Sequence, residues 1–96
     1  MASVRNANSF YVDSTDSLEV LGLSVYTITL TSTSGAGVIT LQDNTDTPTT
    51  KLTLKVPNGE TLLFDFNLMP LLFPNGIVVS VLTNAVATIV FKEGNR

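Results

Sequence analysis

The chain contains no histidine, no cysteine and no tryptophan, and only 14% of its residues are charged. Because histidine is absent, the chain lacks the commonest general base and the commonest protein ligand of metals. Because cysteine is absent, thiolate catalysis, zinc–cysteine sites and disulfide bonds are excluded. These absences favour a protein that acts by contact over one that acts by catalysis.

The carboxylates are the remaining candidates for catalysis or metal binding. Asp43 and Asp46 are close in sequence and lie in a turn-rich stretch. The usual task of an aspartate in such a stretch is a hydrogen bond to the local backbone, and a calcium loop is the alternative. Asp65, between Phe64 and Phe66, is either a solvent-facing residue or a charge that discourages edge-to-edge strand pairing. We expect no catalytic residue, no cofactor and no metal site.

The charge balance and the apolar pattern bear on partners and location. The formal net charge is -3 with five basic residues, whereas a nucleic-acid binder needs a clustered basic face. The longest apolar region, residues 77–91, is too short and too interrupted by polar residues to be a transmembrane helix. The first residues lack the apolar core of a signal peptide. We therefore expect no nucleic-acid or membrane partner, and assembly in the cytoplasm.

Apolar residues alternate with threonine and serine along most of the chain, which is typical of half-buried strands. No window shows a sustained helical period. Leu23 and Val25 are out of phase with Ile28 and Leu30. This mismatch predicts a bulge or bend near residues 22–25.

Turn signals separate the expected strands. Two Pro-Asn-Gly triplets, at residues 57–59 and 74–76, predict tight reversals between antiparallel strands. The pattern predicts an all-β fold, an antiparallel β-sandwich or jelly roll of about seven to eight short strands with minimal helix. Residues 1–8 are expected to be an N-terminal arm, and residues 9–96 a single β-sandwich domain.

One stretch, residues 66–73, is almost continuously apolar, and Pro70 and Pro74 exclude a regular central strand there. It either caps one end of the sandwich as a crossover loop or partly faces another subunit. The polar arm packs either on a neighbouring subunit or on its own domain. The candidate interface consists of Phe66, Leu68, Met69, Leu71, Leu72 and Phe73, together with Val4 and Arg5.

Four segments carry a resemblance to a known group of proteins. They are Val-Ile-Thr-Leu-Gln-Asp-Asn at 38–44, Lys-Leu-Thr-Leu at 51–54, Phe64-Asp65-Phe66 followed by Pro70 and Phe73, and Asn-Gly-Ile-Val-Val at 75–79 followed by Ala-Thr-Ile-Val at 87–90. Across about residues 21–91, the chain resembles small β-sandwich proteins encoded among the virion genes of tailed bacteriophages.

The resemblance implies a non-enzymatic structural protein of the virion. The form it favours is a capsid decoration (cement) protein that binds between capsid subunits, with the major capsid protein or another virion protein as partner. It also implies a homo-oligomer, with a trimer favoured. The alternatives are a component of the neck, tail or fibre base, and a carbohydrate-binding or adhesin module, which the absence of tryptophan disfavours.

Overall fold

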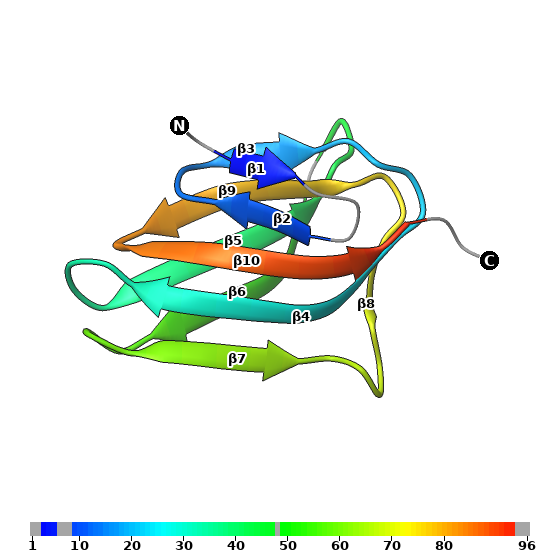
Figure 1. Ribbon diagram of the computed structural model, residues 1–96. Helices are drawn as coiled ribbons and strands as arrows, with labels where there is room; N and C mark the ends of the chain where they lie inside the picture. Colours follow the sequence, from blue (N-terminus) through cyan, green and yellow to red (C-terminus); the bar gives the residue numbers. More distant parts are fainter. Residues whose placement is uncertain (1–2, 6–8, 48, 94–96) are drawn as a thin grey trace.

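The computed structural model describes residues 3–5, 9–47 and 49–93, and this part of the chain contains ten β-strands and no helix. The strands form two antiparallel sheets that pack face to face (Figure 1). The prediction of an all-β sandwich is therefore confirmed. The strands are β1 (Ser3–Arg5), β2 (Ser9–Val12), β3 (Asp16–Leu18), β4 (Leu23–Ser32), β5 (Gly37–Asp43), β6 (Thr50–Val56), β7 (Thr61–Asp65), β8 (Leu71–Phe73), β9 (Ile77–Thr83) and β10 (Ala85–Lys92).

The strand order is that of a jelly roll. The six-stranded sheet has the order β1-β2-β10-β4-β7, with β8 also paired to β4, and the four-stranded sheet has the order β3-β9-β5-β6. The pairs are nested: β2 pairs with β10, β3 with β9, β4 with β7 and β8, and β5 with β6. A long antiparallel ribbon that is folded over into two sheets has this pairing, and two-sheet jelly rolls are built in this way.

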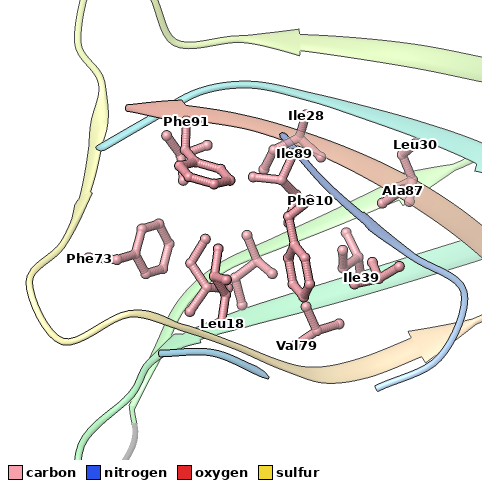
Figure 2. Packing of buried hydrophobic residues seen from close by; sticks show 14 of the residues in the cluster. Phe10, Leu18, Ile28, Leu30, Ile39, Phe73, Val79, Ala87, Ile89 and Phe91 are labelled. Atoms are coloured by element: carbon pink, nitrogen blue, oxygen red, sulfur yellow. The ribbon is translucent and has the colours of Figure 1, made fainter. Parts of the chain in front are cut away.

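The core lies between the two sheets and is entirely apolar among the described residues. Each long strand alternates its side chains between the core and the solvent, as its sequence pattern predicts. Figure 2 shows aromatic and aliphatic side chains from both sheets pointing into this space. The largest fully buried side chains are Phe73, Leu23, Ile28, Leu30, Ile39, Leu41, Ile77 and Ile89.

The phase mismatch in β4 is resolved by a bulge, as predicted. Thr27 is opposite Val90 of β10, and Val25 is opposite the next residue, Phe91, so the register skips Tyr26. One extra residue in a strand reverses the side-chain alternation beyond it. Both halves of β4 therefore turn their apolar residues to the core. The bulge lies just beyond the predicted range of residues 22–25.

The two Pro-Asn-Gly triplets form tight turns, but the strands that they join are not paired with each other. The first links β6 to β7 and the second links β8 to β9, and each therefore passes the chain from one sheet to the other. Both use a glycine with positive φ, 81° at Gly59 and 104° at Gly76. The turn residues therefore predicted the positions of the two turns correctly. They did not predict which sheet the next strand joins, because that depends on tertiary packing.

Two short strands lie where the sequence indicated none. Part of the expected N-terminal arm, residues 3–5, forms β1 and pairs with β2 of the same chain. The rest of that arm lies outside the described residues. The second is β8, which pairs with β4 at the edge of the six-stranded sheet. The prolines at positions 70 and 74 flank it, so neither removes a hydrogen bond from its ladder.

Candidate interaction surface

Four apolar side chains are exposed at one end of the sandwich, and we call them the apolar end. Leu68 is fully exposed, and Met69, Leu21 and Leu72 are 81%, 74% and 60% exposed. Leu21 belongs to the connection between β3 and β4, and the other three come from the β7–β8 segment, at the right of Figure 1. Large apolar side chains that gather at one exposed end of a soluble protein are candidates for a contact site.

The side chains of β8 alternate between the core and the surface. Successive side chains of a strand point to opposite faces, and Phe73 is fully buried whereas Leu72 points outward. Figure 2 shows the Phe73 ring directed into the core. The Lys51 ammonium lies 5.5 Å from the centroid of this ring. Phe73 thus closes the core at the end where Leu72 meets solvent.

Two surface hollows adjoin the exposed side chains. One of about 290 Å³ is lined by Asp65, Phe66, Asn67, Leu68 and Met69. The other, of about 230 Å³, is lined by Gly22, Leu23, Ser24, Leu72 and Pro74. Asp65 is the one charged residue among these linings. The surface therefore combines projecting apolar side chains with apolar depressions.

Hydrogen bonds hold the loops of this end in place. The Asp65 carboxylate accepts bonds from the backbone N–H and the side-chain amide of Asn67, at 2.8 and 2.6 Å. The Gly22 N–H donates to the carbonyl of Pro74 at 2.9 Å, which ties the β3–β4 connection to the β8–β9 turn. A surface that is already ordered loses less conformational entropy on binding than a disordered one.

Asp43 stabilises the same region from the neighbouring sheet. Its carboxylate accepts a bond from the Asn75 backbone N–H at 3.2 Å and one from the Asn75 side-chain amide at 2.9 Å. The expected bond to the local backbone is therefore wrong for this carboxylate, which instead pairs with a turn that is distant in sequence. Among the described residues, no three acidic side chains come together in a group that could hold a metal ion.

The outer face of the six-stranded sheet is a second, flatter candidate surface. Its register places Tyr11, Thr88, Thr29 and Leu63 in one row across four strands. Leu63 is 64% exposed at the β7 end of that row. Threonine hydroxyls on this face bond to one another, as between Thr61 and Thr31 at 3.1 Å. Hydroxyl-rich surface is easier to desolvate than charged surface.

The predicted interface residues are distributed over three environments. Leu68, Met69 and Leu72 are exposed, Phe66 and Leu71 are half-buried against the core, and Phe73 is fully buried. Val4 and Arg5 belong to β1, and their side chains are outside the described part of the structure. Leu21 and Leu63 were missed. The sequence does indicate that Leu63 is exposed, because Leu63 occupies the same face of its strand as the polar residues Thr61 and Asp65. It gives no such indication for Leu21.

No helix among the described residues is long and apolar enough to cross a membrane. Comparisons with models of known protein families, with curated proteins and with solved structures find no match for this chain.

Proposed function

We propose that this protein is a non-enzymatic structural component of a bacteriophage virion, in its simplest form a decoration protein that binds the assembled capsid through the apolar end. The observation that carries the proposal is the exposure of Leu21, Leu68 and Met69 on hydrogen-bonded loops, and of Leu72 on the adjoining strand β8, at one end of the fold. The jelly roll supports it by analogy, since that architecture is common in viral capsid proteins and in lectins.

The size of the apolar end bears on how such binding would work. Burying a large apolar side chain stabilises a complex by roughly 1.5–3 kcal/mol, so four of them supply roughly 6–12 kcal/mol. Association costs an estimated 4–15 kcal/mol in lost freedom of motion. One apolar end alone therefore binds weakly. A partner that displays many equivalent sites, such as a capsid lattice, turns weak contacts into stable attachment when copies are linked.

The test uses purified capsids that lack the protein. The protein is added, bound copies are counted after sedimentation, and the rupture temperature of the particles is measured. Binding together with a higher rupture temperature supports the proposal. Failure to bind refutes it, whereas binding at the neck, the tail or a fibre base, located by electron microscopy, supports the broader virion role and refutes the decoration role.

A matched pair of variants assigns the binding to the apolar end. Leu68→Asp should abolish binding without unfolding the domain, because Leu68 is fully exposed. Val81→Asp is the control, since Val81 is also exposed but lies on β9 in the other sheet. Equal loss of binding in both variants would show that net charge, and not the apolar end, controls attachment.

A further inference from the structure

The edges of the two sheets differ in how well they are protected against pairing with another strand. In the four-stranded sheet, β3 is three residues long, and β6 carries two lysines and a bulge where the register skips Lys51. Short strands, lysines and bulges all discourage edge pairing. In the six-stranded sheet, β1 is also three residues long. By contrast, β7 has five residues, with no lysine, proline or bulge. Its one charged side chain, Asp65, is at its last residue, and the carboxylate already accepts two bonds from Asn67.

The backbone of β7 has bonding groups available at its outer edge. The Phe66 N–H donates to Tyr26 and the Ser32 N–H donates to Glu60, in the same register as the β4–β7 ladder. In an antiparallel pair, residues that bond to the neighbour alternate with residues that do not. Even-numbered residues of β7 therefore bond to β4, and Thr61, Leu63 and Asp65 turn their N–H and C=O groups away from it. No strand of the described chain pairs with that edge.

We propose that β7 pairs with β7 of a second copy, antiparallel and centred on Leu63, so that two six-stranded sheets become one continuous sheet. This register places Leu63 opposite Leu63 and Thr61 opposite Asp65. All of these are residues whose bonding groups face the open edge, and the pair gains about six backbone hydrogen bonds.

The side chains match this register on both faces. On the outer face, the two exposed leucines meet at the twofold axis, and each Asp65 carboxylate lies opposite a threonine hydroxyl and not opposite another carboxylate. On the inner face, the half-buried Leu62 lies opposite the half-buried Phe64 of the other copy, which extends the core across the junction. A parallel arrangement in register would instead place like charges side by side. The strand is thus complementary to itself, which favours a second copy over an unrelated strand as the occupant.

This inference does not depend on the virion role, and it predicts a twofold dimer, whereas the family resemblance implies a trimer. The register is tested by two substitutions at the residue opposite Asp65. Thr61→Lys places a lysine opposite each Asp65 carboxylate, and Thr61→Glu places a second carboxylate there. Both variants lose the same bond to Thr31, so each is the control for the other.

The dimer dissociation constant, measured by sedimentation equilibrium, should be roughly tenfold or more lower for Thr61→Lys than for Thr61→Glu, because opposite charges stabilise a directly facing cross-strand pair and like charges destabilise it. High salt should narrow the difference. Equal constants, the reverse order, a trimer, or a monomer at every concentration tested would overturn the proposal.

Hydrogen exchange tests the same contact without any substitution. The amides of Leu62 and Phe64 should be protected at all concentrations, because they bond to β4. The amide of Leu63 should gain at least tenfold protection as the protein concentration rises through the dimer dissociation constant. Because the chain has no cysteine, a Leu63→Cys variant should also cross-link to itself with a short bismaleimide, whereas Leu68→Cys should not. Rapid Leu63 exchange in the assembled protein, or cross-linking through position 68 instead, would refute β7 pairing.

Discussion

Gly37 is the first residue of β5, which begins at the end of the sandwich away from the apolar end (Figure 1), and it gives a sharp test of the packing. A Cβ added there would lie 2.7 Å from the Cβ of Ala85, 2.9 Å from the carbonyl oxygen of Asn84 and 3.0 Å from a methyl group of Val56. Non-bonded carbon atoms prefer separations of about 3.5–4.0 Å. The three contacts come from β6, from β10 and from the turn before β10, so no single movement relieves all of them.

The expected loss follows from two opposing effects. Overpacking a close-packed site costs about 1–3 kcal/mol. Replacing glycine with alanine also restricts the unfolded chain, which stabilises the fold by about 0.4–1 kcal/mol. Three simultaneous close contacts place the overpacking cost in the upper part of its range, at about 2–3 kcal/mol. We therefore expect Gly37→Ala to lower the free energy of unfolding by about 1–2.5 kcal/mol, which for a domain of this size corresponds to roughly 4–20 °C in melting temperature.

Urea unfolding followed by circular dichroism measures the effect, and a double-mutant cycle identifies its source. Ala85→Gly removes the nearest contact, so the double variant should be more stable than the sum of the two single changes predicts, with a coupling of about 0.5–3 kcal/mol. The Asn84 carbonyl remains, and so recovery should be partial. A Gly37→Ala protein within about 0.5 kcal/mol of the original, which is the ordinary range of surface substitutions, or strictly additive single changes would refute this description of the site.

Three further substitutions test other parts of the structure by the same measurement. Phe73→Ala should cost about 3–5 kcal/mol, because it leaves a cavity at the end of a closed core; a loss below 1 kcal/mol would contradict the burial of that ring. Leu72→Asp should change the free energy of unfolding by less than about 1 kcal/mol, since the side chain is largely exposed; unfolding of the domain would show that Leu72 caps the core. Asp43→Ala should cost about 1–2 kcal/mol through the loss of two bonds to Asn75, and an unchanged stability would show that solvent replaces those bonds.

Much of the fold could be predicted from local patterns. The alternation in β4 to β7, β9 and β10 identified strands and their buried faces, and the phase change between Val25 and Ile28 predicted a bulge that the structure places at Tyr26. These features depend on the period-two geometry of a strand and on little else. The pairing order could not be predicted in the same way, because turn residues determine that the chain reverses and not which sheet it then joins.

The candidate surface was predictable only in part, for a related reason. Residues 66–73 are almost continuously apolar, and composition alone does not distinguish a buried phenylalanine from an exposed leucine. The division depends on β8, a three-residue strand whose existence is due to pairing with β4. Leu21 lies in a connection with no periodic pattern, and its exposure follows from the path of the chain between two sheets. The pairing of β8 and the exposure of Leu21 both depend on tertiary structure, so neither can be predicted from the local sequence.

The two proposed contacts are compatible in space, and together they have a consequence for binding. The apolar residues Leu68 and Met69 follow the Asp65 end of β7. Antiparallel pairing about Leu63 directs these ends away from each other, so a dimer carries two apolar ends on opposite sides of its junction. Such a dimer binds neighbouring sites of a repeating surface bivalently, and bivalency raises apparent affinity without any new contact when the spacing fits. A Thr61→Glu variant should then bind an isolated partner subunit as well as the original protein does, yet bind the assembled lattice more weakly. Equal loss of binding to both targets would show that β7 contacts the partner directly, whereas undiminished binding to the lattice would show that attachment needs only one copy.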